Sequence, residues 1–497
     1  MLNKITVLLF ICIITLIQQG FSQLILHVGP GQTYANPAQA AAAAHPGDTI
    51  LIHPAMYGGA FFIENLKGTA QAWITIKGIN RDQVIFQGGT ESMHFIDAEY
   101  VSVSNLTITG QTGNGMNIDD GGSYATSAKH MVIDNCIFHD MAASGNNDML
   151  KLSGLDSFTV SNCRFENGSA GGSGIDMVGC HVGLFTKNNF LNQGSNSIQA
   201  KGGSSNIHIE RNHFFNGGER SLNLGGSTGA AFFRPFGVNY EAKDLLVTAN
   251  IFEGSEAPVA YVGCRNVSVI NNTFILPETW IMRILQESSD TSFYLSSANN
   301  TFSNNIVVVN NSLRSDVNIG PYTSAATFRF SNNLWYHVQN ANWNGPQLPA
   351  TETGGITKQN PLLRDYNNKD YSLGDNSPAI GKGKKYNGYA NDFDGKLFLN
   401  PPSIGAFEKI VVIRNNEITN FQEVKLFPNP CTDYFIVNNL QEQTTINLID
   451  VYGKIIFQFQ NISLSKVIDM SKVYPGWYYL KVSNTYVQRN FLIQKTD

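Results

Sequence analysis

The sequence is poor in charged residues. Only 14% of its 497 residues are charged, and 33 basic residues against 38 acidic ones give a net charge of −5. A nucleic-acid-binding protein has a basic excess, so we expect no nucleic-acid partner. Disorder is also excluded, because 42% of the residues are hydrophobic and 11% are aromatic. The polarity comes from 54 Asn and 46 Gly residues, a composition typical of a β-rich chain with many tight turns.

Long apolar runs are missing beyond the N-terminus. There, Lys4 precedes the apolar stretch ITVLLFICIITLI, and the small residues Gly20 and Ser22 stand just before Gln23. This pattern predicts a secretory signal peptide over residues 1–22, because the stretch is short for a membrane span. A single N-terminal anchor is the alternative. We expect the mature chain to have no membrane span and to be secreted or displayed on the cell surface, after export through the periplasm.

Cysteine is scarce as well. The chain has six cysteines, of which Cys12 lies in the predicted signal peptide, and no C-x-x-C pair. The five that remain are an odd number, so neither a full disulfide framework nor a zinc knuckle is indicated. We expect four of them to stack inside a repeated structure, because they recur at repeat positions: Cys136, Cys163, Cys180 and Cys264.

A short phrase recurs through the middle of the chain: Asn or Cys, any residue, then an aromatic or aliphatic residue. It ends at residues 138, 165, 190, 214, 252, 274, 307 and 335. The steps run from 22 to 38 residues, and most match one coil of a right-handed parallel β-helix. Coils of such a solenoid stack about 4.8 Å apart, which predicts internal Phe stacks and a ladder of Asn side chains at a bend. Leucine-rich repeats and WD-type propellers lack support, because their consensus residues are absent.

The two ends of this region resemble the pectate-lyase-like β-helix superfamily. Residues 37–44 are typical of a short amphipathic helix that caps the open end of a solenoid. At the far end, Ser377-Pro378-Ala379 and Ile404-Gly405-Ala406-Phe407-Glu408 resemble the closing segment of the superfamily. The resemblance implies an all-β fold, a right-handed parallel β-helix over residues 23–408. It leaves the chemistry open, because one fold hosts many reactions.

The last 75 residues have a different sequence pattern. Alternating strands are broken by turn residues, as in a small β-sandwich. Three phrases, Phe427-Pro428-Asn429-Pro430, Asp450-Val451-Tyr452-Gly453-Lys454 and Gly476-Trp477-Tyr478-Tyr479-Leu480, resemble the C-terminal sorting domain of type IX secretion cargo of Bacteroidota. The resemblance implies that residues 423–497 are recognised by the type IX machinery, after a linker at residues 409–422. A carbohydrate-binding sandwich is the alternative.

Strands that precede the recurring phrase can be aligned with one another. Their second and fourth residues are apolar and are expected to point inward, which leaves a middle column that points outward. This column contains Lys151, Asp176, Gln199, Asn223 and Ala260, and is continued by Arg283. Lys201 falls in the next outward column. Such clustering of charge in a chain with little charge favours a polysaccharide-binding face. The alternative is a merely polar face whose neighbours pair as salt bridges.

The step of 38 residues marks a long excursion, roughly Gly225 to Lys243, beside this column. It carries Arg234, Glu241 and three phenylalanines. Loops on a rigid scaffold are where binding residues gather. A packed insertion that covers an apolar patch is the alternative.

The phrases that mark polygalacturonases, pectin methylesterases and the first pectate lyase family are missing. Lys201, followed by Asn206, Ile209, Asn212 and Phe214, resembles the Lys-containing coil of lyases similar to chondroitinase B and the alginate lyases. The resemblance implies β-elimination on a uronic-acid polymer, a reaction that needs a base and neutralisation of the substrate carboxylate.

In this interpretation Lys201 is the base, Arg220 pairs with the substrate carboxylate, and Lys151 is the reserve base. The arginine of those lyases would fall near Gly225 here, so the resemblance does not secure the activity.

The other expected substrate contacts lie in or beside the two outward columns: Asp148, Asp176, Gln199, Asn223, Arg234, Glu241, Arg283 and Glu287. Asp148 and Asp176 are candidates for holding Ca²⁺, although no cofactor or metal site is certain. Two other functions stay open: a β-helix glycoside hydrolase that uses paired carboxylates, and a non-catalytic glycan-binding or adhesive surface protein. We expect a monomer.

Overall fold

The structure is a computed structural model that describes residues 23–123, 125–386, 388, 391–409, 424–450, 453–484 and 488–496. The chain divides into two compact units, Met1–Ile410 and Val411–Asp497. The predicted signal peptide at residues 1–22 and nearly all of the predicted linker lie outside the described residues. No helix in the described part of the chain has the length and apolar character needed to span a membrane.

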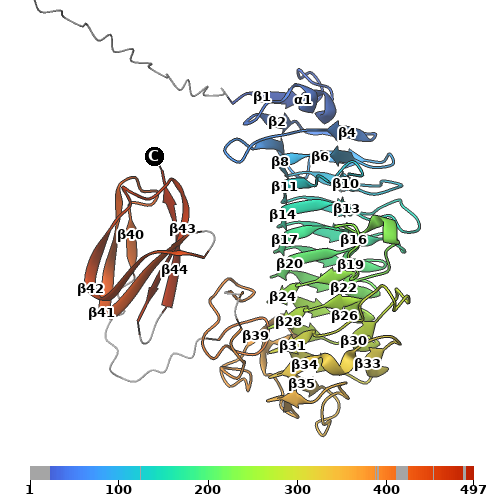
Figure 1. Cartoon of the computed structure of the whole chain (residues 1–497), viewed down its shortest axis with the longest axis vertical. Coiled ribbons are helices and arrows are strands. Elements are labelled where there is room, and N and C mark those ends of the chain that lie inside the picture. The colour runs from blue at the N-terminus through green and yellow to red at the C-terminus, as the bar shows by residue number, and fades with distance from the viewer. Residues whose placement is uncertain are drawn as a thin grey trace, which may run out of the picture. The chain divides into compact units, whose positions relative to one another are not determined.

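The first unit is a solenoid built from three long parallel sheets (Figure 1). We name them sheets A, B and C, in the order in which the chain passes through them in most coils. The all-β parallel solenoid predicted from the sequence is confirmed.

Sheet A contains β1 (Ile25–Val28), β2 (Thr49–Ile52), β5 (Ile74–Gly78), β8 (Glu99–Ser104), β11 (Ala128–Asp134), β14 (Leu155–Ser161), β17 (His181–Thr186), β20 (Ser204–Glu210), β23 (Ala242–Lys243), β24 (Leu246–Thr248), β27 (Cys264–Arg265), β28 (Ser268–Ile270), β31 (Thr301–Ser303), β34 (Arg329–Ser331) and β36 (Glu352–Thr353). Sheet B contains β3 (Ala55–Tyr57), β6 (Val84–Gln87), β9 (Thr107–Thr109), β12 (Ile137–His139), β15 (Arg164–Glu166), β18 (Asn189–Leu191), β21 (His213–Phe215), β25 (Ile251–Glu253), β29 (Thr273–Ile275), β32 (Ile306–Val309), β35 (Leu334–His337) and β37 (Ile356–Thr357). Sheet C contains β4 (Phe61–Glu64), β7 (Met93–Ile96), β10 (Met116–Asp119), β13 (Leu150–Ser153), β16 (Ser173–Val178), β19 (Asn196–Lys201), β22 (Arg220–Gly225), β26 (Ala257–Val262), β30 (Trp280–Leu285) and β33 (Ser315–Ile319).

The recurring phrase builds the two stacks that hold the coils together. Its aromatic residue lies in sheet B and faces the core, where six rings stack with centroids 4.7–4.9 Å apart: Phe138, Phe165, Phe190, Phe214, Phe252 and Phe274. This spacing equals the distance between neighbouring strands, so each ring covers the ring of the next coil.

The Asn of the phrase forms the predicted ladder at the bend between sheets A and B. The amide Nδ2 of Asn188 donates to Oδ1 of Asn212 at 3.0 Å, and Asn212 donates to Asn250 at 3.0 Å. The ladder continues through residues 272, 305 and 333. All of these side chains are buried, and the residue before each adopts a left-handed backbone that makes the bend, as Lys187 does with φ 58°.

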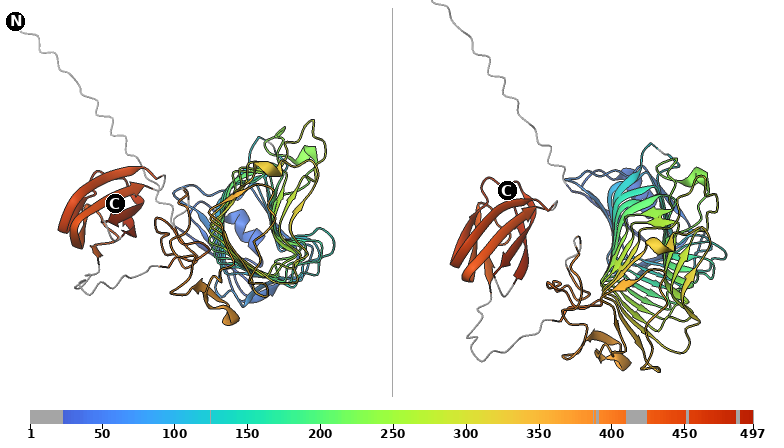
Figure 2. Two further views of the ribbon diagram at one scale, coloured as in Figure 1. Left: turned by 90° about the horizontal axis from the view of Figure 1, so that it is seen from below. Right: turned by 60° about the horizontal axis from the view of Figure 1, so that its bottom comes forward.

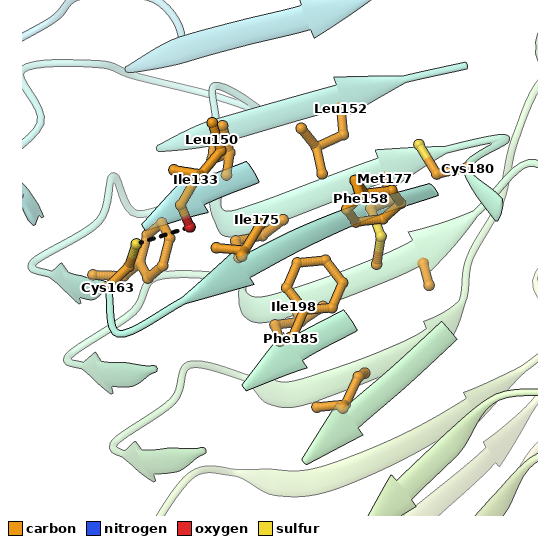
Figure 3. Close-up of a cluster of buried hydrophobic side chains, with 14 of the residues drawn as sticks. Ile133, Leu150, Leu152, Phe158, Cys163, Ile175, Met177, Cys180, Phe185 and Ile198 are labelled. Carbon is orange, nitrogen blue, oxygen red and sulfur yellow. Dashed lines mark hydrogen bonds between the residues drawn. The ribbon is translucent and has the colours of Figure 1, made fainter. Parts of the chain in front are cut away.

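The cysteines lie in these stacks as small apolar residues. Cys136 and Cys163 occupy the positions that Asn takes in later coils, and the amide of Cys163 donates to Asn188 Oδ1 at 2.9 Å. Cys180, Ala242 and Cys264 share a second column through the register of sheet A. All five cysteines from Cys136 on are buried and unpaired. Figure 3 shows Cys163 and Cys180 within the packed interior, with the thiol of Cys163 directed at the carbonyl of Ile133.

Helix α1 (Pro37–Ala43) caps the N-terminal end, as predicted. Asn36 caps the helix by accepting a 3.0 Å hydrogen bond from the amide of Gln39, and Pro37 occupies the first turn, where it needs no donor. Ala40 and Ala41 are buried. Figure 2 shows α1 lying across the end of the solenoid, so the first coil is covered rather than left as an open edge.

The closing segment packs against the outside of sheet B. It contains the antiparallel pair β38 (Leu363–Asp365) and β39 (Asp370–Leu373), joined by the short helix η3 (Tyr366–Asn368). Ile404 and Ala406 from the predicted closing phrase are buried in a second apolar cluster with residues of β25, β29 and β32.

The second unit is a single curled antiparallel sheet of β40 (Lys425–Phe427), β41 (Tyr434–Asp450), β42 (Ile455–Asp469), β43 (Gly476–Ser483) and β44 (Gln488–Lys495). One face of the sheet buries its own apolar core, which includes Phe435, Leu448, Ile468 and Leu480. The predicted all-β character is confirmed, but the described strands form one sheet and not the two packed sheets of a sandwich.

Candidate functional site

The outward column predicted from the sequence exists on sheet C, the sheet that contains β10, β13, β16 and β19 in Figure 1. Strand register aligns Lys151 with Asp176, Asp176 with Gln199, and Gln199 with Asn223. Ala260 and Arg283 follow. Lys201 aligns with Val178 in the neighbouring outward column, as predicted.

The centre of the column is a compact charged cluster around Asp176. The Nζ atoms of Lys151 and Lys201 both pair with Oδ2 of Asp176, the latter at 3.2 Å. Lys151 also lies 3.4 Å from Oδ2 of Asp148. The side chains of Asp176 and Asp148 are 0% and 1% exposed, while those of Lys151 and Lys201 are 20% and 14% exposed. The lysines therefore cover the carboxylates and face the solvent themselves.

Burial and charge perturb this cluster. Burial, together with the nearby charge of Asp176, raises the pKa of Asp148 to about 6. Burial alone would lower the pKa of Lys151, but the carboxylates of Asp176 and Asp148 outweigh it and raise that pKa. Perturbed titrating groups gathered on one face are typical of functional sites.

A polar network runs from this cluster toward the C-terminal coils. Lys201 donates to Oε1 of Gln199 at 3.1 Å, and Asn223 is the register neighbour of Gln199. Arg220 donates to Oδ1 of Asn223 at 3.1 Å and pairs with Glu287 at 2.7 Å. Lys201 and Arg220 therefore flank the Gln199–Asn223 pair.

Arg283 extends the face by another two coils. Its Nε donates to Oδ1 of Asn318 at 3.0 Å, and its guanidinium lies 4.5 Å from the ring centroid of Trp280. Burial and the charge of Arg220 lower the pKa of Arg283. The face therefore ends in an arginine that lies on an indole ring.

The long excursion between β22 and β23 lies along one edge of this face. It contains the short helix η1 (Ala230–Phe232), and its first residue, Gly226, lies against the side chains of Gln199 and Lys201. Phe233 is buried against Tyr294, with ring centroids 5.7 Å apart. Phe232 and Phe236 are 62% and 73% exposed. The loop is thus both a packed insertion and a wall beside Lys201, and Figure 2 shows it projecting from the solenoid.

Arg234 fixes this loop to a distant coil. Its Nε and Nη2 form a bidentate ion pair with Asp120, at 2.5 and 2.7 Å, and the side chains are 13% and 2% exposed. The arginine passes over Gly154 and Gly179, both with positive φ; a Cβ at Gly179 would lie 2.5 Å from a side-chain carbon of Arg234. Only glycine leaves this path open.

Glu241 does not face the substrate side, so we remove it from the predicted contacts. It is 1% exposed. Its carboxylate accepts hydrogen bonds from the amides of Gly202 and Thr228, and from the hydroxyls of Thr228 and Ser288. A buried charge with four donors holds the base of the loop, a structural role.

The alignment of this chain's own strands identified only the C-terminal part of the column. Phe62, His94 and Asn117 continue it in register through β4, β7 and β10 to Lys151. The alternation Met93-His94-Phe95 and Met116-Asn117-Ile118 carries the same signal as the later strands. It was overlooked because the recurring phrase that served to align the strands begins only at Cys136.

The Ca²⁺ prediction does not fit the donor set. Lys151 contacts both carboxylates that were candidates for the ion, so an ammonium already occupies the place between Asp148 and Asp176. In the part of the chain that the structure describes, no three His, Cys, Asp or Glu side chains gather as a metal site.

The fold and the face together define a class: a parallel β-helix with a charged column of side chains along one sheet. Residues 92–274 match the family described as right handed beta helix region, and residues 425–494 match the secretion system C-terminal sorting domain. The chain is therefore a right-handed β-helix protein with a type IX sorting domain, which directs it to the cell surface or the extracellular space.

Several solved structures are similar to this chain, and pectate lyase Pel9A shares its fold. The crystal structure of pectate lyase Pel9A matches with a TM-score of 0.51 and 16% identity, over 79% of this chain and 98% of that one. The A-module of the mannuronan C-5 epimerase AlgE6 of Azotobacter vinelandii matches with a TM-score of 0.43 and 15% identity, over 64% and 93%. An alginate lyase from Paenibacillus sp. str. FPU-7 matches with a TM-score of 0.37 and 15% identity, over 63% and 98%. No curated protein matches in sequence.

Proposed function

We propose that this exported protein cleaves a uronic-acid-containing polysaccharide by β-elimination while the polymer lies along the outward face of sheet C. The observation that carries the proposal is the cluster of Lys151 and Lys201 on the buried Asp176, beside the loop wall. Buried charges are costly and a solenoid does not need them on an outward face, so their placement there favours a ligand.

The face suits an extended anionic chain. Four cationic side chains (Lys151, Lys201, Arg220 and Arg283) follow one another along it, and the exposed Phe232 and Phe236 stand on the adjoining loop. Coils repeat about every 4.8 Å, close to the length of one sugar ring, so successive rings meet successive coils. Aromatic side chains next to such a floor offer surfaces for sugar rings.

Lys201 is the proposed base and Arg220 the proposed partner of the substrate carboxylate. Nζ of Lys201 in its neutral form takes the proton from C5, and the electron pair of that bond forms the C4–C5 double bond. The glycosidic oxygen leaves C4 and takes up a proton from water. Arg220 stabilises the negative charge that builds up on the carboxylate.

A non-catalytic glycan-binding role is the second candidate. Lys151 and Lys201 both pair with Asp176, and Arg220 pairs with Glu287. This pairing fixes the cationic side chains in place, which also suits a site that binds a glycan without cleaving it. A hydrolase is less favoured, because the two carboxylates at the centre are buried beneath lysines.

The test is incubation of the full-length secreted protein with a panel of uronate polymers, with the ultraviolet absorbance of the unsaturated product as readout. Lys201→Ala should abolish the signal and keep the fold, because the side chain lies outside the core. Lys201→Arg should also fail, since guanidinium stays protonated. Lys129→Ala is the matched control: this lysine lies on sheet A and pairs with Glu99. Normal turnover by Lys201→Ala on an active substrate would move the base to Lys151. Normal turnover by both Lys201→Ala and Lys151→Ala would end the proposal.

A further inference from the structure

Among the residues that the structure describes, three side chains of the outward column carry a buried polar atom without a hydrogen-bond partner: Nδ1 of His94, Oδ1 of Asn117 and Oδ1 of Asp176. Such atoms are few in native proteins, and each requires an explanation. Asp176 belongs to the charged cluster described above. Asn117 lies two coils away from Asp176, so the charged cluster does not account for its unpaired atom.

The surroundings of Asn117 are built and rigid. Its Nδ2 lies 3.2 Å from Nε2 of His94, and the same imidazole nitrogen lies 2.6 Å from Oδ2 of Asp119. Nδ1 of His94 lies 3.3 Å from Glu91. On the next coil Phe62, 54% exposed, has its ring centroid 5.3 Å from that of His94. An exposed aromatic ring therefore adjoins a row of fixed polar groups.

The charge at this end of the column differs from that at Lys151. Asp119 and Glu91 both contact His94 and together raise its pKa to about 9, so this cation is matched by two carboxylates. Lys151 on the next coil is already paired with Asp148 and Asp176. A further carboxylate would meet two negative side chains and no spare cation. A neutral ring with hydroxyl groups meets no such repulsion, and one hydroxyl can form a hydrogen bond with the side-chain amide of Asn117 as donor or as acceptor.

We propose that Phe62, His94, Asn117 and Asp119 form a subsite for an uncharged, hydroxyl-rich pyranose ring. This inference rests on the proposed function, because it places that ring on the polymer bound at Lys151 and Lys201. Three coil steps separate Phe62 from Lys151, about 14 Å at the strand spacing. The substrate is then a mixed polysaccharide, with neutral sugars several rings away from the uronic acid that is cleaved.

Calorimetry on the full-length protein tests the subsite with two hexasaccharides. One contains only uronic acid, and in the other uronic acid alternates with neutral hexose. The wild type should bind the alternating probe more tightly. Phe62→Ala and Asn117→Ala should each weaken that binding about three- to tenfold and leave the all-uronate probe unaffected. Met56→Ala is the control, because Met56 is 68% exposed but lies on sheet B.

Equal binding of the two probes by the wild type, or wild-type affinity for the alternating probe in both variants, overturns the subsite. An equal loss of affinity for both probes also overturns it, because the ring would then not be a neutral one. These results do not depend on cleavage. If Phe62→Ala selectively loses the alternating probe while no polymer is cleaved, the subsite stands and the lyase proposal fails.

Discussion

The ion pair between Arg234 and Asp120 gives the most direct test of how the long excursion between β22 and β23 is held against the solenoid. Asp120→Asn removes the counter-charge of an arginine that is only 13% exposed and lies over two glycines. Removing one partner of a buried pair costs about 3–5 kcal/mol. Because the loop can instead detach and return Arg234 to water, we expect a loss near the lower limit, about 3 kcal/mol.

Chemical denaturation measures the loss in free energy of unfolding, and limited proteolysis reports cleavage within residues 226–241. Asp120→Asn should accelerate that cleavage. Arg234→Gln combined with Asp120→Asn should cost less than the two single changes added together, as expected for groups in contact. The control is Asp82→Asn, whose exposed pair with Arg81 should contribute at most about 1 kcal/mol. Additive losses, or proteolysis at the wild-type rate, would refute the clamp.

Three further predictions concern the rest of the molecule. Phe214→Ala interrupts the ring stack between Phe190 and Phe252 and should lower the free energy of unfolding by about 3–5 kcal/mol, as measured by urea titration. Hydrogen bonds to Asp119 and Glu91 raise the pKa of His94 from 6.5 to about 9. The contribution of protonated His94 to the free energy of unfolding is therefore complete below pH 6.5 and is lost as the pH rises through 9. The wild type should therefore lose up to about 3 kcal/mol relative to His94→Gln between pH 6 and 10, whereas parallel stability curves would contradict the assignment. Deletion of residues 423–497 should leave the protein in the periplasm in cell fractionation, and surface display of the truncated chain would count against the sorting role.

The solenoid could be predicted because its long-range contacts repeat a local pattern. Each phrase such as Asn212-His213-Phe214 places one ladder amide and one ring, so the same residues at the same position in every coil imply a stack. Coils without the phrase escaped this reasoning. Leu106-Thr107-Ile108 takes the same place without Asn or Phe, and His94 and Asn117 lie in that part of the chain.

The candidate site could be predicted only in part. Alternation along the strands is enough to place Lys151 and Asp176 side by side. It predicts the face of the sheet on which a side chain lies but not the partner that the side chain contacts, so the pairing of Lys201 with Asp176 and of Arg220 with Glu287 emerged only from the structure. The path of the excursion was equally inaccessible, because Arg234 binds a carboxylate 114 residues earlier in the chain. Glu241 was misplaced because a loop residue was expected to be exposed.

Because the coils stack at a regular spacing, the number of coils sets the distance between side chains along the solenoid. The separation between Phe62 and Lys201 is set by the number of coils between β4 and β19, and not by any particular contact along the way. Removing one whole coil, such as residues 154–178, would shorten it by about 4.8 Å while every remaining strand keeps an equivalent neighbour. Loss or duplication of a coil is thus a single genetic event that changes the spacing of ligand positions by one fixed step.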